Sequence, residues 1–280
     1  MLSPDLQIEN VYIAIVNGLR NFFAKANMKK AIIGLSGGID SAVVAAITVD
    51  ALGKENVHGF MMPSEFSTLH SIQDAVDLAE NLGIQYNVVP ISAIYNKFIR
   101  ELAPVFGPEN KWNVAEENLQ ARIRGTLLMA YSNKFNALLL NTSNKSELST
   151  GYGTLYGDLA GAAMVIADLY KCEVYELADY INRDNIIIPI STITKAPSAE
   201  LREGQKDSDS LPDYSVLDPL LYALNEEGKS YDKLLLEGFD NDTLNKIIKL
   251  RRGAAFKVSQ IPPIFNISSK PIGYKEKWLL

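Results

Sequence analysis

The amino-acid sequence predicts an α/β protein with a doubly wound parallel sheet and flanking helices. Short apolar runs alternate with longer segments of helical periodicity, and glycine or proline ends many of them. The runs lack polar alternation, as is typical of strands buried on both faces. The 280 residues are 47% hydrophobic and 21% charged, which is an ordinary globular composition. We therefore expect one α/β domain over residues 1–280.

The expected strands are short and apolar. They lie at residues 31–35, 57–62, 84–91 and 137–140. In parallel sheets of this class, ligands bind beyond the carboxyl ends of the strands. We therefore expect the site in the loops that begin at Ser36, Met62 and Asn141.

The expected helices follow from apolar residues that recur every three or four positions. The segment 41–52 is apolar on most faces, which is typical of a buried crossover helix. The predicted helices span residues 8–23, 41–52, 69–82, 92–102, 113–133, 173–183, 216–225 and 242–252. Residues 189–213 are poor in periodicity and rich in charge, and we expect a mobile loop there.

Composition excludes several classes of function. A net charge of −6 argues against a duplex nucleic-acid binder, which needs a basic face. The sequence has no secretory signal pattern and no apolar run of about 18 residues, so we expect no membrane span. A single cysteine, Cys172, fits a reducing cytoplasm. Two histidines and one cysteine cannot form a His/Cys zinc site, so any metal must use oxygen ligands, which suits Mg²⁺.

The strongest motif is the segment 34–41, with the sequence GLSGGIDS. It follows a predicted strand and opens a predicted helix. Gly37 and Gly38 allow the backbone to approach an anion, and the free N–H groups at the helix start attract negative charge. Ser36 and Ser41 add hydroxyl donors. The segment lacks the lysine of a GxxxxGK[ST] loop and does not match GxGxxG, so a plain glycine turn is the competing interpretation.

This loop resembles the pyrophosphate-gripping SGGxDS loop of the ATP-pyrophosphatase superfamily, which implies an adenine nucleotide alpha hydrolase-like fold. Three later motifs follow in order: NLQARIR at 118–124, NTSNKSE at 141–147 and GYGTLYGD at 151–158. Together the four motifs resemble the NAD synthetase family over residues 8–257. In that family, ATP adenylates the nicotinate carboxylate of deamido-NAD, and ammonia then displaces AMP.

The resemblance implies roles for the matching residues, none of them a side-chain nucleophile. Asp40 and Glu147 would hold Mg²⁺, and Arg122 and Lys257 would contact deamido-NAD. The ATP-binding residues would be Gly34, Leu35, Ser36, Gly37, Gly38, Ile39, Asp40, Ser41, Met62, Thr142, Lys171 and Ser198. Plain alternatives exist: Glu147 also suits a helix cap, and Lys257 a surface lysine. With Ser198 tethered to ATP, residues 189–213 would form a lid that closes over the nucleotide.

Two positions depart from the family pattern. Leu155 and Ala162 stand where many ammonia-dependent members have a substrate-contacting Lys and Asp. Nicotinate mononucleotide therefore stays open as an alternative substrate. The likeness begins near Met1 without a glutaminase domain, so we expect free ammonia, or ammonia from a separate glutaminase, as the nitrogen source.

The resemblance also implies the partners. They are the small molecules deamido-NAD, ATP and ammonia, with no nucleic acid and no membrane, and the family implies a homodimer. A non-catalytic nucleotide-binding module is the alternative from a different class. Such a module would predict a degraded metal pair, whereas Asp40 and Glu147 are both present.

Overall fold

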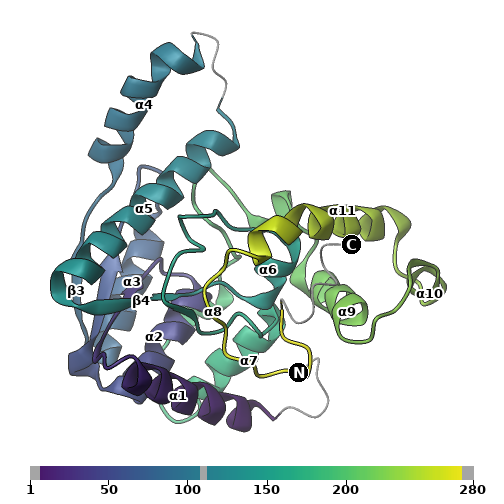
Figure 1. The fold of residues 1–280 in the computed structure, drawn as a ribbon, viewed down its shortest axis with the longest axis horizontal. Helices are drawn as coiled ribbons and strands as arrows, with labels where there is room; N and C mark the ends of the chain where they lie inside the picture. Colours follow the sequence, from purple (N-terminus) through teal and green to yellow (C-terminus); the bar gives the residue numbers. More distant parts are fainter. Residues whose placement is uncertain (1–6, 108–111, 273–280) are drawn as a thin grey trace.

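A single sheet of five parallel strands runs through the molecule (Figure 1). The computed structural model describes residues 7–107 and 112–272. The strands are β1 (Lys30–Gly34), β2 (Val57–Met61), β3 (Gln85–Val88), β4 (Ala137–Asn141) and β5 (Ala163–Met164). Their order is β3-β2-β1-β4-β5, and every neighbouring pair is parallel. The predicted doubly wound parallel sheet is confirmed.

The helices of the described residues connect the strands and form a second group near the carboxyl terminus. They are α1 (Ile8–Lys25), α2 (Ile39–Leu52), α3 (Leu69–Leu82), α4 (Ser92–Phe106), α5 (Val114–Phe135), α6 (Lys145–Thr150), α7 (Lys171–Ile181), α8 (Ile190–Thr194), α9 (Tyr214–Asn225), α10 (Tyr231–Leu236) and α11 (Asn241–Val258). Short 3₁₀ turns occupy Lys54–Asn56 and Asp207–Asp209. Among the described residues, no helix combines the length and the apolar character that crossing a membrane requires.

Helices cover both faces of the sheet, which explains why its central strand is apolar after the exposed Lys30. Successive side chains of a strand point to opposite faces. Accordingly, Ala31 and Ile33 of β1 are buried in the core formed with α1, α2 and α7. Ile32 is buried in the other core, with Phe60 and residues of α4 and α5. A strand enclosed on both sides has no position for a polar side chain, so it reads as a continuous apolar run.

The topology places a crevice at the carboxyl ends of β1 and β4. These two strands are neighbours, although the chain visits β2 and β3 between them. The order of the strands reverses at this point, and in such sheets the crevice for a ligand opens there. β1 leads into the segment 34–41 and α2, and β4 leads into the segment 141–147 and α6. Two motifs that are about a hundred residues apart in the sequence therefore face each other.

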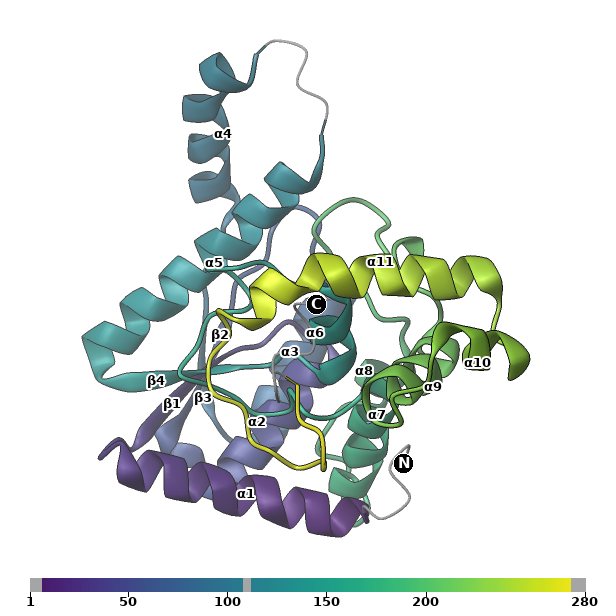
Figure 2. The same cartoon turned by 45° about the vertical axis from the view of Figure 1, so that its right-hand side comes forward.

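Helices α9, α10 and α11 gather beside the sheet around an apolar core of their own (Figure 2). Leu217, Leu221, Leu234 and Leu244 are fully buried in it. This group also contacts the sheet domain directly, because α11 packs against α6 and α9 packs against α6 and α7. The short helix α6 is therefore enclosed between the sheet and this group.

Several elements differ from the sequence prediction. Strand β3 covers four residues rather than 84–91, because it is the edge strand and three of its four side chains are exposed. The helix predicted to end at Leu102 continues to Phe106, and its only proline, Pro104, falls in the last turn, where the helix is solvent-exposed. The short elements β5, α6, α8 and α10 were not predicted.

The segment 189–213 has more structure than the sequence predicted. It begins with helix α8 and contains the turn Asp207–Asp209. The side chains of Thr192, Asp207 and Leu211 are buried. Leu211 packs with the apolar core of α9–α11, which gives this segment an anchor that its own composition did not reveal. Its mobility without a ligand stays a prediction.

Candidate active site

The glycine loop after β1 forms a tight turn that only glycine permits. Gly37 has φ +77°, and a Cβ atom on it would lie 2.1 Å from the carbonyl oxygen of Ser71 on α3. Ser36 Oγ accepts a hydrogen bond from the Gly38 N–H at 3.1 Å, and Ser41 Oγ donates to the Gly38 carbonyl at 3.0 Å. The loop is thus held by its own hydroxyls and packed against α3, which prepares the start of α2 for an anion.

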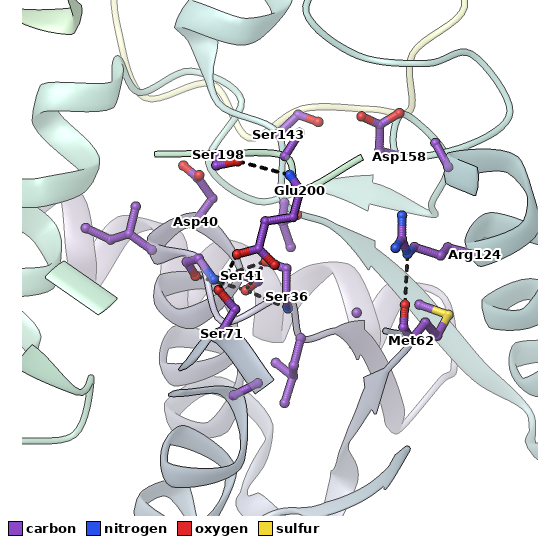
Figure 3. A pocket seen from close by; sticks show the side chains of 18 of the residues that line it. Ser36, Asp40, Ser41, Met62, Ser71, Arg124, Ser143, Asp158, Ser198 and Glu200 are labelled. Carbon is purple, nitrogen blue, oxygen red and sulfur yellow. Dashed lines mark hydrogen bonds between the residues drawn. The ribbon is translucent and has the colours of Figure 1, made fainter. Parts of the chain in front are cut away.

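A cavity of about 320 Å³ opens above this loop, at the carboxyl ends of β1, β2 and β4 (Figure 3). Its volume is at the lower end of the range for ligand pockets. The glycine loop forms part of its wall, and residues 141–143 after β4 form another part. Met62 after β2 and Arg124 on α5 contribute from another side, and residues 195–201 contribute from the segment after α8.

Asp40, Lys171 and Glu147 form a charged cluster in the cavity wall. Lys171 Nζ lies 2.5 Å from Asp40 Oδ2. Asn144 donates to both carboxylates, from Nδ2 to Asp40 Oδ1 at 2.9 Å and from its backbone N–H to Glu147 Oε2 at 3.2 Å. Three elements therefore meet here, because Asp40 lies in the first turn of α2, Glu147 lies in α6 and Lys171 begins α7.

The electrostatics of the cluster reflect two carboxylates close to one cation. Burial, followed by the neighbouring Asp40 carboxylate, raises the pKa of Glu147 well above its usual range, although Lys171 opposes this. For Lys171, burial lowers the pKa, but the carboxylates of Asp40 and Glu147 outweigh burial and raise it above its ordinary value. The lysine is therefore cationic at neutral pH, and its single positive charge faces two carboxyl groups.

Glu147 has both of the roles that the sequence allowed. Asn144 and Glu147 form a reciprocal capping box at the start of α6, in which Asn144 Oδ1 accepts from the Glu147 N–H at 3.0 Å. The same Glu147 side chain lines the cavity. The cap fixes the orientation of the carboxylate toward Asp40 and Lys171.

A third acidic side chain, Asp207, approaches this cluster from the segment 189–213. It is buried and lines the cavity. Its two oxygens accept hydrogen bonds from the hydroxyls of Tyr152 at 3.1 Å and Tyr214 at 3.0 Å. Burial raises the pKa of Asp207, while Lys171 and the two tyrosines lower it. This contact connects the segment 189–213 to the floor of the cavity.

The opposite wall carries a partly buried arginine. Arg124 Nε donates to the Met62 carbonyl oxygen at 3.0 Å (Figure 3). Burial lowers the pKa of Arg124 to about 10, although the charges of Asp158 and Glu200 oppose this. The guanidinium thus remains charged at neutral pH and lies where the wall formed by β2 meets α5.

Glu200 ties the loop after α8 to the start of α3. Its carboxylate accepts from the Thr68 N–H at 3.1 Å, from the Thr68 hydroxyl at 3.0 Å and from the Ser71 hydroxyl at 2.7 Å. Figure 3 shows the side chain of Glu200 reaching toward Ser71. Glu200 has φ +48°, a conformation that side chains rarely adopt. Nearby, Ser198 is exposed, and its hydroxyl donates to the Gln205 carbonyl oxygen at 2.6 Å.

The cavity brings most of the predicted site residues together. The predicted residues in its wall are Gly34, Leu35, Ser36, Gly38, Ile39, Asp40, Ser41, Met62, Thr142, Glu147, Lys171 and Ser198. Gly37 shapes the turn without lining the cavity.

Arg122 and Lys257 do not line the cavity; they lie around the loop 151–158. Arg122 Nε donates to the Leu155 carbonyl oxygen at 3.3 Å. Lys257 Nζ donates to the carbonyl oxygens of Gly151 at 2.8 Å and Gly153 at 2.6 Å. Burial lowers the pKa of Lys257, and Arg122 lowers it further. In this conformation both side chains hold the loop, so their predicted contact with a substrate stays a prediction.

Comparison with known proteins agrees with this geometry. The family model described as NAD synthase matches residues 11–261. The chain belongs to the NAD synthase family. It is 48% identical over 270 residues to a glutamine-dependent NAD(+) synthetase of Synechocystis, covering 96% of this chain and 48% of that protein. It is 45% identical over 267 residues to the one of Thermotoga maritima, covering 95% of this chain and 46% of that protein. The chain thus spans about half the length of these curated relatives.

Solved structures of the family include proteins of comparable length. An NH3-dependent NAD synthetase from Campylobacter jejuni, solved with nitrate, matches with a TM-score of 0.74 and 33% identity over 94% of this chain and 100% of that one. An NMN synthetase from Francisella tularensis matches with a TM-score of 0.77 and 28% identity over 95% and 99%. A glutamine-dependent enzyme from Acinetobacter baumannii in complex with ADP matches with a TM-score of 0.67 and 40% identity over 97% and 49%. These similarities support the expected adenine nucleotide alpha hydrolase-like fold.

The sequence analysis gave no site role to several polar or charged residues of the cavity wall, among them Arg124, Tyr152, Asp158, Lys195, Glu200 and Asp207. Arg124, Tyr152 and Asp158 lie within the motifs that were recognised, so the motifs themselves held that signal. Lys195, Glu200 and Asp207 reach the cavity through contacts between distant segments, such as the hydrogen bond that the Ser71 hydroxyl donates to Glu200.

Proposed function

We propose that this chain catalyses the ATP-dependent amidation of deamido-NAD to NAD through an adenylated carboxylate. One observation carries the proposal: Asp40, Glu147 and Lys171 meet beside the glycine loop in the wall of one cavity. Joining a carboxylate to a polyanionic triphosphate requires neutralising charge, and cations and N–H donors are the usual means. The intact pair of carboxylates argues against the alternative of a non-catalytic nucleotide-binding module.

The donor set in this cavity fits magnesium. Asp40 and Glu147 offer carboxylate oxygens, and the pKa of Glu147 is raised first by burial and then by the neighbouring Asp40 carboxylate. Mg²⁺ is usually held by one or two carboxylates together with water and substrate phosphates. Accordingly, no group of three or more potential His, Cys, Asp or Glu ligands is needed, and none occurs in the described parts of the chain. When bound there, Mg²⁺ would neutralise charge that develops on the leaving pyrophosphate.

The reaction has two steps. In the first, a carboxylate oxygen of the nicotinate group attacks the α-phosphorus of ATP, the bond from that phosphorus to the bridging oxygen breaks, and pyrophosphate leaves. Lys171 and the N–H groups at the start of α2 would stabilise this charge. In the second, the nitrogen of ammonia attacks the acyl carbon, AMP leaves, and one proton is released. Residues 195–201 would exclude water, which otherwise hydrolyses the adenylate.

We propose free ammonia as the nitrogen donor for this 280-residue chain. Glutamine use requires an activated nucleophile, and the only cysteine is Cys172. Burial, followed by the nearby Asp218 carboxylate, raises the pKa of the Cys172 thiol, which disfavours the thiolate. The full-length match to an NH3-dependent enzyme supports this donor. The glutamine-dependent relatives leave a separate glutaminase as the alternative ammonia source.

Nicotinate mononucleotide is the second candidate substrate. Leu155 is partly buried against an apolar cluster that includes Leu148 and Leu159, so it offers no charge to a substrate. Ala162 likewise has no polar side chain. The structural similarity to an NMN synthetase supports this candidate. The family resemblance further implies a cytoplasmic homodimer. Light scattering on the purified chain tests the oligomeric state.

One assay tests the proposal. Purified protein is incubated with ATP, Mg²⁺ and ammonium, with either deamido-NAD or nicotinate mononucleotide, while AMP and pyrophosphate are measured. We expect one AMP and one pyrophosphate per amide formed, with deamido-NAD preferred. Preference for the mononucleotide would favour the second candidate. Formation of ADP and phosphate instead would contradict both candidates. A parallel reaction with ammonia-free glutamine should give no amide.

A further inference from the structure

A buried carboxylate on α9 joins the two short segments that carry the charged cluster. Asp218 has 0% exposure and does not line the cavity. Its Oδ1 accepts from the Ser146 hydroxyl at 2.6 Å, and its Oδ2 accepts from the Cys172 backbone N–H at 2.8 Å. The Ser146 hydroxyl oxygen in turn accepts from the Lys171 backbone N–H at 2.9 Å. Three hydrogen bonds therefore connect α6, α7 and α9 behind the cavity.

The position of these bonds matters more than their number. Ser146 immediately precedes Glu147, and the Lys171 backbone N–H belongs to the residue whose side chain meets Asp40. Ser146 has 0% exposure, so water does not replace a lost bond there. A shift of α6 against α7 would change the separation between the Glu147 carboxylate and the Lys171 ammonium. Small displacements of groups that stabilise developing charge have large effects on rate.

We propose that Asp218 and Ser146 are positioning residues that fix Glu147 and Lys171 relative to each other for binding and splitting of Mg²⁺–ATP. The proposal rests on the proposed function, and it deepens it by adding residues that touch neither substrate nor metal. It explains why a carboxylate is kept in a fully buried position, where charge is costly unless hydrogen bonds satisfy it.

The test uses Ser146→Ala and Asp218→Ala in the full chain, with Ser132→Ala as the matched control. Ser132 is buried, and its hydroxyl donates to the Ala137 carbonyl oxygen at 2.6 Å, at the amino end of β4 away from the cavity. All three variants lose a buried hydroxyl or carboxylate bond. Thermal unfolding measures the stability that each loses, and all assays run well below the lowest Tm.

Two readouts separate positioning from stability. The first is the kcat for pyrophosphate release. The second is the dissociation constant for Mg²⁺ with α,β-methylene-ATP, measured by calorimetry, which does not depend on amidation. We expect Ser146→Ala to lower kcat and weaken analogue binding by about 10- to 100-fold, the usual effect of removing a residue that orients metal ligands. Ser132→Ala should change neither by more than about twofold, since its bond is remote from the site.

The double variant sharpens the result. Because Ser146 and Asp218 act through one shared bond, the double variant should lose little more than the worse single variant. The proposal is overturned if Ser146→Ala binds the analogue and turns over as well as Ser132→Ala does. Failure of Asp218→Ala to fold leaves Ser146→Ala to decide. If the wild-type chain binds the analogue but amidates neither candidate substrate, the proposed function fails while analogue binding still decides the positioning role.

Discussion

Two buried lysines, 26 positions apart, show how similar surroundings serve different purposes. Lys145 has 1% exposure, and Lys171 has 2%. Lys145 Nζ lies 2.9 Å from Asp168 and 2.5 Å from Glu226, while Lys171 Nζ lies 2.5 Å from Asp40. By burial and pairing alone, neither lysine stands out as functional.

The difference lies in what surrounds each ion pair. Lys145 Nζ also donates to the Ser268 hydroxyl and the Lys270 carbonyl, so the ammonium group has its hydrogen-bond partners within the protein. Asp168, its partner, accepts further bonds from the backbone of residues 267 and 268. The cluster thus fastens the chain after α11 to the start of α6. Lys171 instead lies in the cavity wall, and the side chain of its partner Asp40 remains 18% exposed.

Access to the cavity, rather than burial, distinguishes Lys171 from Lys145. Lys145 lies in the same recognised motif as Glu147, and motif membership alone would have given it a role toward ATP. The structure gives it a structural role instead.

Removing either carboxylate of the cavity cluster should abolish adenylation. Asp40→Asn and Glu147→Gln each take away one negative charge from the proposed magnesium site. Several kcal/mol of transition-state stabilisation should be lost, which corresponds to a fall of at least about 100-fold in pyrophosphate release. Circular dichroism should show an intact fold. Release at nearly the wild-type rate by either variant would remove the proposed magnesium site.

Replacing the two lysines should separate activity from stability. Lys171→Met should lower pyrophosphate release by about 100-fold or more, with a modest loss in the free energy of unfolding, because Asp40 opens to the cavity. Lys145→Met should cost about 3–5 kcal/mol of stability, since it leaves two buried carboxylates without their cation. Urea unfolding and the pyrophosphate assay measure both quantities. Equal stability losses from the two variants would refute the comparison.

The glycine loop offers a steric test. Gly37→Ala should lower nucleotide binding by more than tenfold, because its Cβ atom would meet the Ser71 carbonyl oxygen. Gly228→Ala is the matched control, since Gly228 has φ +66° but no atom within 4 Å of an added Cβ. Both variants place an alanine in a left-handed conformation, which is unfavourable. Only Gly37→Ala also displaces α3 from the loop. Calorimetry with ATP and Mg²⁺ measures the difference, and similar affinities would contradict it.

The smallest expected effect concerns the segment 189–213. Arg202 pairs with Asp209 at 2.7 Å and with Glu117 at 3.3 Å, and Lys206 is exposed. Ion pairs that are partly exposed, as these are, contribute little stability. We therefore expect trypsin to cut at Arg202 and Lys206 in the free protein, and ATP, Mg²⁺ and deamido-NAD together to slow cleavage severalfold. Equal cleavage with and without these ligands would leave the segment as a plain surface loop.

Much of the fold was predictable from local patterns. Strand β2 begins at the predicted residue, and β1 and β4 shift by no more than one residue, because buried parallel strands are apolar runs between breakers. Strand β5 was missed because two residues give no periodicity. Helix α6 was missed because its six residues, KSELST, are mostly polar, although Asn144 and Glu147 carry a capping signal.

Site residues were predictable where a motif directly follows a strand. They were not predictable where side chains from distant segments meet. The residues of the glycine loop, Thr142 and Glu147 follow β1 and β4, so topology alone brings them together. Asp218 and Glu200 act through bonds to Ser146 and Ser71, which are 72 and 129 positions away. Such contacts depend on how helices pack, and no local pattern records them.

An isotope experiment shows whether an adenylated carboxylate forms in this cavity. Deamido-NAD labelled with ¹⁸O in the nicotinate carboxylate is converted with ATP, Mg²⁺ and ammonium, and the products are examined by mass spectrometry. If a carboxylate oxygen attacks the α-phosphorus, AMP carries one ¹⁸O atom, and pyrophosphate carries none. Unlabelled AMP, or label in phosphate, would contradict an adenylated intermediate.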